Sequence, residues 1–199
     1  MQPIPKLIIL GRDGILNEFR EDHIKAPEEW VAVPGALEAV SRLNHAGWHA
    51  VVATNQSGIG RGMIDMAAVN AVHAHMMQRL QAHSGRIDAV FFCPHTPEEG
   101  CDCRKPQPGM MRDIGRRYGV DLRLVPMVCD TLRDLQAAQA AGCEPHLVRS
   151  GRAAALDAAG VASWLEQVPG TIVHSDLSAL ATHLLDREHL RDSESGGLN

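Results

Sequence analysis

Short apolar runs recur along the chain, and each has the length of a buried β-strand. They are Leu7–Leu10, Ala50–Ala53, Ala89–Phe92, Pro126–Cys129, His146–Val148 and Thr171–Val173. Helical patterns separate them: Gly35–His45, a helix N-capped by Asp65 with Val69, Val72, Met76 and Leu80 on one face, Gly109–Tyr118, Leu132–Ala141, Ala153–Ala159 and Leu177–Leu185. This alternation predicts an α/β fold, an open and mostly parallel sheet with helices on both faces.

Two segments fall outside the alternation and are predicted to be inserted loops, 17–30 and 93–108. The charged, then Ser- and Gly-rich end of the chain favours a single domain over 1–186 and a flexible tail over 187–199. On the helix after Asp65, His73 and His75 are expected at the surface.

Composition narrows the class of protein. Of the 199 residues, 45% are hydrophobic and 22% charged, as in a globular protein with a core, and the formal net charge of -5 argues against a nucleic-acid partner. The apolar run near the N-terminus is too short for a signal peptide, and no stretch is long enough to span a membrane. We therefore expect a cytoplasmic monomer that acts on a small molecule, without a membrane partner.

Polar residues follow the predicted strands at the points where ligands bind in open parallel sheets. Gly11-Arg12-Asp13-Gly14 follows the first strand, Thr54 begins TNQSGIGRG after the second, and Asp130 follows the fourth, with Asp134 one turn later. Singly, each could be a turn or cap residue. Together, a hydroxyl, backbone amides, a lysine and several acids predict a site for phosphate and Mg²⁺.

The strongest single signal is the stretch C-x-H-x5-C-x-C formed by Cys93, His95, Cys101 and Cys103. Three sulfurs and one imidazole complete a tetrahedral Zn²⁺ shell and leave no open position, so the predicted metal is structural. Arg104 and Lys105 follow directly, and Lys105 is one of only three lysines in the chain. The zinc would therefore aim two cations at the predicted phosphate site.

Four motifs in this order, GRDGILN, TNQSGIGRG, CPH…CDCRKP and CDTLRD, resemble those of the haloacid dehalogenase superfamily. In detail they resemble the D-glycero-D-manno-heptose 1,7-bisphosphate 7-phosphatase family of lipopolysaccharide precursor synthesis. The resemblance spans roughly Leu7 to Arg149 and implies a Rossmann-like core with a minimal cap of inserted loops. The histidinol-phosphate phosphatases share the zinc loop, so histidinol phosphate is the second candidate substrate.

The resemblance also implies roles for single residues. Position 11 carries the nucleophile, and Asp13 is the general acid and base. Thr54 and Lys105 stabilise the phosphoryl group. The substrate is bound by Asn55, Gln56, Ser57 and Arg104, and Mg²⁺ by the main chain of Asp13 and the side chain of Asp130.

Three positions depart from the family pattern. Gly11 stands where the family has the nucleophilic Asp, Cys129 stands in place of a Gly, and Phe19 stands where many relatives carry an acid. Arg12 is expected to point away across the pleat and cannot replace the missing acid. Two interpretations follow. The chain is a working phosphatase, through a sequence error at position 11 or some substitute chemistry, or it is a catalytically inactive relative that binds a sugar phosphate or scaffolds a partner.

Overall fold

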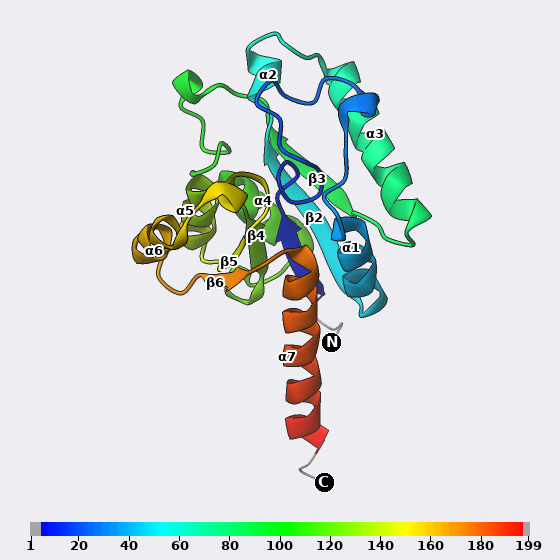
Figure 1. Ribbon diagram of the computed structural model, residues 1–199, viewed down its shortest axis with the longest axis vertical. Coiled ribbons are helices and arrows are strands. Elements are labelled where there is room, and N and C mark those ends of the chain that lie inside the picture. The colour runs from blue at the N-terminus through cyan, green and yellow to red at the C-terminus, as the bar shows by residue number, and fades with distance from the viewer. Residues whose placement is uncertain (1–4, 197–199) are drawn as a thin grey trace.

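The computed structural model describes residues 5–196, and its centre is a six-stranded parallel sheet (Figure 1). The strand order is β3-β2-β1-β4-β5-β6. The strands are β1 Lys6–Leu10, β2 Trp48–Asn55, β3 Ala89–Cys93, β4 Pro126–Cys129, β5 Glu144–Val148 and β6 Ile172–His174. All six predicted strands are confirmed, as is the α/β class.

Each strand is followed in sequence by one or two α-helices. They are α1 Ala36–His45, α2 Ser57–Gly60, α3 Met66–Ala82, α4 Gly109–Tyr118, α5 Leu132–Ala141, α6 Ala158–Gln167 and α7 Leu177–Gly196. Asp65 caps α3 as predicted, since its side chain accepts a hydrogen bond from the backbone of Ala68. The predicted inward face of α3 is buried as well.

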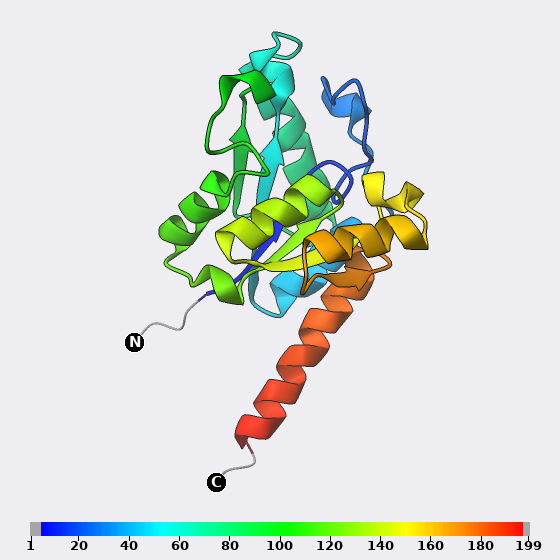
Figure 2. The same cartoon turned by 90° about the vertical axis from the view of Figure 1, so that its left-hand side faces the viewer.

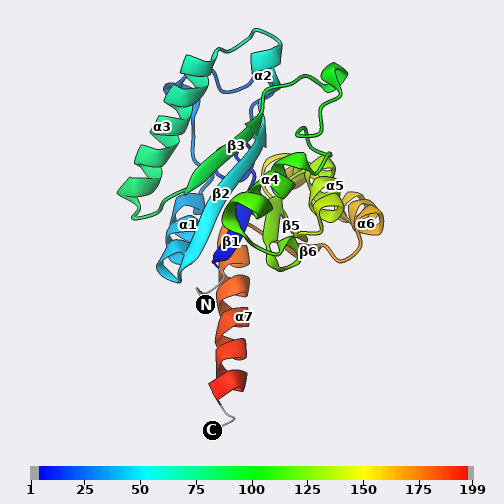
Figure 3. The ribbon, with the colours of Figure 1, turned by 180° about the vertical axis from the view of Figure 1, so that it is seen from behind.

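Two hydrophobic layers cover the sheet, one on each face, because alternate residues of a strand point to opposite sides (Figures 2 and 3). Ile8 and Leu10 of β1 pack with α1, α3 and α7, whereas Leu7 and Ile9 pack with α4 and α5. All four side chains are at most 2% exposed. Burial on both faces holds β1 rigidly at the centre of the sheet. The turn that begins at Gly11 is therefore fixed in place as well.

One predicted helix is wrong in its position. Instead of a helix over Ala153–Ala159, a 3-10 turn covers Gly151–Ala155, and α6 begins only at Ala158. Asp157 is extended, and its side chain accepts a hydrogen bond from the backbone of Gly160 at 2.7 Å. This cap starts a new helix rather than continuing the old one.

The last helix is longer than predicted. α7 continues past Leu185 to Gly196 and projects from the body of the protein (Figure 1), so residues 187–196 of the segment expected to be a tail are helical. Arg187 forms ion pairs with Glu144 at 2.5 and 2.9 Å, and Glu188 lies 2.9 Å from Lys6 Nζ. The charged residues that suggested a tail therefore form ion pairs with the first residues of β1 and β5, at the amino-terminal end of the sheet. Residues 197–199 lie outside the described part of the chain.

The two inserted loops lie at the carboxyl ends of the strands. The first contains a 3-10 turn at Pro27–Glu29, and the second contains one at Pro97–Glu99, which the Thr96 and Glu99 side chains stabilise as a capping box. A further 3-10 turn covers Leu122–Leu124. Among residues 5–196, no helix combines the length and the apolar character needed to cross a membrane.

Candidate active site

A polar cavity of about 270 Å³ opens at the carboxyl ends of β1, β2 and β4. The structure brings most of the predicted site residues to its wall. These are Gly11, Asp13, Thr54, Asn55, Ser57, Arg104, Lys105 and Asp130. Gln56 does not line the cavity but contacts Asp13 from behind, with Nε2 3.2 Å from Oδ2.

Gly11 lies directly after β1, and its backbone N–H donates to the Val128 carbonyl at 3.2 Å. A Cβ built on Gly11 would lie 3.0 Å from Ile15 Cγ1 and 3.7 Å from the Val128 carbonyl. The first contact is tight, but it involves only a side-chain atom, and the backbone of Gly11 is not left-handed. Position 11 can therefore accept a side chain if Ile15 moves by a few tenths of an ångström.

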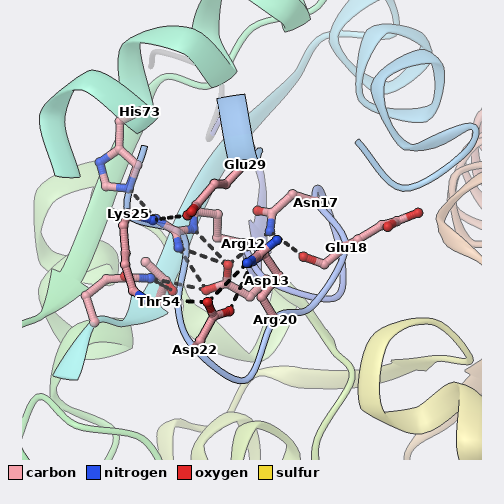
Figure 4. A network of polar contacts seen from close by, with 11 residues as sticks. Arg12, Asp13, Asn17, Glu18, Arg20, Asp22, Lys25, Glu29, Thr54 and His73 are labelled. Carbon is pink, nitrogen blue, oxygen red and sulfur yellow. Dashed lines mark hydrogen bonds and ion pairs between the residues drawn. The ribbon is translucent and has the colours of Figure 1, made fainter. Parts of the chain in front are cut away.

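The Asp13 carboxylate is surrounded by donors (Figure 4). Arg12 pairs with it through Nη2 at 2.9 Å, and Asn17 Nδ2 donates to Oδ1 at 3.0 Å. Burial raises the pKa of Asp13, but the Arg12 charge and the hydrogen bonds from Asn17, Arg12 and Gln56 outweigh it and lower the pKa below its ordinary value. Asp13 is therefore a carboxylate before substrate arrives.

The structure corrects two expectations around Asp13. Arg12 does not point away: the chain has already left the extended conformation after Leu10, so the pleat rule no longer applies, and the guanidinium folds back onto Asp13. His73 is not at the surface but 8% exposed, with its ring nitrogen Nε2 3.2 Å from Arg12 Nη1. It lies between Val72 and Met76 on the inward side of α3, so it is drawn into the protein with them.

Lys105 and Thr54 form the floor of the cavity. Lys105 is 4% exposed, and its ammonium donates to the Ala53 carbonyl at 3.0 Å and pairs with Asp134 Oδ2 at 3.1 Å. Because an ammonium has three N–H donors, one remains for a ligand. Asn55 exchanges two 3.1 Å hydrogen bonds with the Lys105 backbone, so its amide holds the zinc loop against β2.

The Asp130 carboxylate lies against two backbone segments that approach each other closely, at Gly14 and at Gly151. The backbone N–H of Arg152 donates to its Oδ2 at 3.0 Å, and a Cβ on either Gly14 or Gly151 would overlap that same oxygen. Burial, then the negative charge of Asp134, raises the pKa of Asp130 to about 6. A divalent cation at Oδ1 would relieve this unfavourable charge, so the residues present fit a Mg²⁺ site.

Three arginines that were given no role from the sequence also line the cavity, beside the predicted Arg104: Arg61, Arg133 and Arg152. Within the described residues none of them forms an ion pair with a carboxylate. Burial, together with the charges of Arg133 and Arg61, lowers the pKa of Arg104. The guanidinium of Arg152 lies 3.9 Å from the centre of the Phe19 ring, which joins the first inserted loop to the segment after β5.

The four predicted zinc ligands converge. The sulfurs of Cys93, Cys101 and Cys103 lie 3.1 to 3.5 Å apart, and His95 Nδ1 lies 3.3 Å from Cys103 Sγ. These separations are too long for a disulfide and somewhat shorter than the S···S edge of about 3.8 Å in a tetrahedral zinc site, so the four donors lie close enough to share one ion. Arg104, next in sequence, donates to the His95 carbonyl at 3.1 Å and so extends from the cluster toward the cavity.

Comparison with known proteins relates the chain to hydrolases. A family model described as HAD-hydrolase-like matches residues 102–180. The chain is 52% identical over 181 residues to D-glycero-beta-D-manno-heptose-1,7-bisphosphate 7-phosphatase of Bordetella bronchiseptica, a match that covers 90% of this chain and 98% of the relative. The enzyme of the same name from Pseudomonas aeruginosa is 45% identical, over 90% of this chain and 97% of the relative.

Solved structures give the same relationship. The crystal structure of the D,D-heptose 1,7-bisphosphate phosphatase from B. bronchiseptica, complexed with magnesium and phosphate, superposes with a TM-score of 0.85 at 51% identity. That match covers 92% of this chain and 99% of the other. The corresponding phosphatase from Burkholderia thailandensis gives a TM-score of 0.69 at 45% identity, covering 90% of this chain and 98% of that one.

Proposed function

We propose a function from one premise: this chain belongs to the D-glycero-D-manno-heptose 1,7-bisphosphate 7-phosphatase family of haloacid dehalogenase-like hydrolases. Its cavity binds that bisphosphate at the 7-phosphate, and the family reaction is the Mg²⁺-dependent hydrolysis of this phosphomonoester. One observation carries the proposal: Asp13, Thr54, Lys105 and Asp130 converge on one cavity at the end of the sheet.

The phosphoryl group lies on the floor of the cavity in this proposal. Thr54 Oγ1 and the free N–H of Lys105 contact its oxygens, and Asp134 keeps Lys105 in place. Farther out, Arg104, with Arg61 and Arg133 nearby, meets the remainder of the sugar phosphate. A bisphosphate suits this distribution, since cations with donors to spare occur both at the floor and at the rim.

Mg²⁺ would be held by the Asp130 carboxylate and the Asp13 carbonyl, where it would neutralise phosphoryl charge. Asp13 starts ionised. The phosphate dianion raises its pKa on binding, so Asp13 can take up a proton, pass it to the leaving sugar oxygen and later recover one from water. Asn17 and Gln56 keep the carboxylate oriented during both transfers.

The covalent step depends on position 11. In the family route a carboxylate oxygen there bonds to phosphorus while the bond from phosphorus to the sugar oxygen breaks, and water then cleaves the acyl phosphate. Gly11 supplies no oxygen. This observation favours a second candidate function for the chain as written, a heptose-phosphate-binding protein whose turnover is lost or very slow.

The remaining proposals concern context. The thiolates of the cysteine cluster need a reducing compartment, which supports the cytoplasm. A free sugar phosphate, rather than a macromolecule, suits the cavity of about 270 Å³, and we propose that the chain acts as a monomer.

Phosphorus NMR of the chain with Mg²⁺ and heptose 1,7-bisphosphate tests the function. Loss of the 7-phosphate signal with release of inorganic phosphate assigns a phosphatase. A shifted signal that persists assigns a binding protein. No change in either signal overturns the proposal, and a parallel sample with histidinol phosphate distinguishes the substrates.

A further inference from the structure

Arg12 differs from the other arginines that line the cavity because it is buried almost completely. Its side chain is 1% exposed, whereas that of its partner Asp13 is 27% exposed. Nε and Nη2 both donate to Asp13, at 3.2 and 2.9 Å to Oδ1 and 3.1 Å to Oδ2. Nη1 lies on the other side of the guanidinium and cannot serve the same carboxylate.

The partner of Nη1 is His73 of α3, at 3.2 Å from Nε2 (Figure 4). A guanidinium has only donors, so His73 must be the acceptor, with Nε2 unprotonated and the proton on Nδ1. Burial, then the Arg12 charge, lowers the pKa of His73 to about 4, which agrees with a neutral ring. The geometry therefore requires one particular tautomer.

We propose that His73 is a positioning residue, which fixes the Arg12 guanidinium and through it the direction of the Asp13 carboxylate. The proposal rests on the proposed function of Asp13 as the proton donor and acceptor of the reaction. His73 itself is separated from the cavity by Arg12 and touches no reacting atom. It acts by accepting a hydrogen bond from the buried Arg12 guanidinium, whose Nη1 would otherwise have no acceptor.

A packing role alone does not explain the residue. The neighbouring inward positions of α3 are apolar: Val69, Val72, Met76 and Leu80. An apolar side chain at position 73 would fill the same space but leave Nη1 buried without an acceptor, and the guanidinium would then tilt toward water. Asp13 would then lose the hydrogen bonds from Arg12 that, together with those from Asn17 and Gln56, set the direction of its carboxylate.

The first test uses the chain as written and needs no turnover. Nitrogen NMR of the histidine rings should show His73 as the neutral Nδ1–H tautomer at pH 7. The Arg12 Nη resonances should be resolved in the native chain and averaged in His73→Leu. A His73 ring protonated on Nε2 would overturn the proposal, since it could not accept from Arg12, and so would Arg12 resonances that His73→Leu leaves unchanged.

The second test measures kinetics in the Gly11→Asp chain. His73→Leu should lower kcat about tenfold, the lower end expected for removing a group that orients a functional residue, with KM within about twofold. His73→Gln keeps an acceptor and should recover most of kcat, while His75→Leu, two residues away on α3, is the matched control. Equal kcat with His73 and with His73→Leu would overturn the proposal; an inert Gly11→Asp chain would count against the proposed function, and the NMR result would still decide the role of His73.

Discussion

The cysteine cluster and the turn after β1 lie at the same edge of the sheet, but they differ in completeness. The cluster has all four donors of its metal within 4.8 Å of one another. The turn keeps Asp13 and the groups that orient it, yet has Gly11 where the proposed reaction places the attacking acid. The first region fixes a loop of the cavity wall, whereas the second lacks the side chain that the proposed reaction needs.

The difference indicates that the residues proposed to bind the phosphate and the residue proposed to break the bond belong to separate parts of the structure. Lys105 reaches the cavity because Asn55 and the cluster hold its loop, and nothing in that arrangement depends on position 11. A chain can therefore lose the nucleophile and still build a cavity for a phosphate. Four experiments probe this separation.

The largest effect is expected from Gly11→Asp. Removing a nucleophile while its binding groups remain costs about 10⁶ in rate in a serine protease, or roughly 8 kcal/mol of barrier. Restoring the acid should therefore raise Mg²⁺-dependent phosphate release by several orders of magnitude. The measurement is phosphate release from heptose 1,7-bisphosphate under saturating substrate.

Gly11→Asn is the matched control, since its side chain has the same shape as an aspartate and makes the same contact with Ile15, but an amide is a poor nucleophile. It should restore little activity. Equal rates for the native chain and Gly11→Asp would show that another residue attacks, and the comparison between the two regions would fail.

The second effect concerns phosphate affinity without metal. An acid at position 11 would repel a bound phosphate dianion by up to about 4 kcal/mol at an effective dielectric constant of about 20 and a separation of roughly 4 Å. The native chain should therefore bind heptose bisphosphate in the absence of Mg²⁺ more tightly than Gly11→Asp does. Calorimetry with and without added Mg²⁺ measures this, and native binding that vanishes when only Mg²⁺ is omitted would contradict it.

The third effect is removal of zinc. Purified chain should contain about one Zn²⁺ per molecule, measured by elemental analysis of unchelated protein. Cys101→Ser should weaken heptose bisphosphate binding about 10- to 100-fold, the value of one charge-assisted hydrogen bond, because Lys105 and Arg104 lose their fixed loop. Cys143→Ser, a buried cysteine outside the cluster, controls for loss of a thiol, and circular dichroism should show the sheet intact in both variants.

The smallest effect is a pH dependence remote from both regions. Burial, then the charges of His146 and His183, lowers the pKa of His174 to about 4, with Asp176 opposing them. Between about pH 6.5 and pH 4, His174 is protonated in the unfolded chain and neutral in the folded chain. The free energy of unfolding should therefore fall as the pH drops through this range. The slope is at most about 1.4 kcal/mol per pH unit for this group.

Urea unfolding at pH 7 and pH 5 measures the slope, and His174→Gln should reduce it. A steeper fall in His174→Gln than in the native chain would contradict the assignment. Zinc-site and position 11 variants should leave the contribution of His174 unchanged, which separates global stability from both regions.

Much of this arrangement was predictable, because apolar strands and their following residues are local signals. The strands, the capped start of α3 and the grouping of Asp13, Thr54, Lys105 and Asp130 follow from sequence periods and the parallel topology. The zinc ligands could be predicted because all four fall within eleven residues.

The errors arose where side-chain direction depends on tertiary contacts. Arg12 reverses direction in a turn, and His73 is buried because α3 packs over that turn, which no local pattern shows. The signal for α6 was present, since Asp157 is an N-cap, but the preceding alanines suggested an earlier start. The ion pair that attaches α7 to β5 joins Arg187 to Glu144, which is distant in sequence.

The glycines around Asp130 limit which substitutions leave the predicted Mg²⁺ ligand in place. Gly14 and Gly151 have left-handed backbones and face the same carboxylate oxygen, so any side chain at either position displaces Asp130. Gly11 has neither restriction. A glycine codon and an aspartate codon can differ by a single base, and the backbone at position 11 would accept the acid. Loss of either neighbouring glycine would make such a return ineffective, because a returned nucleophile would find no ordered partner for the metal.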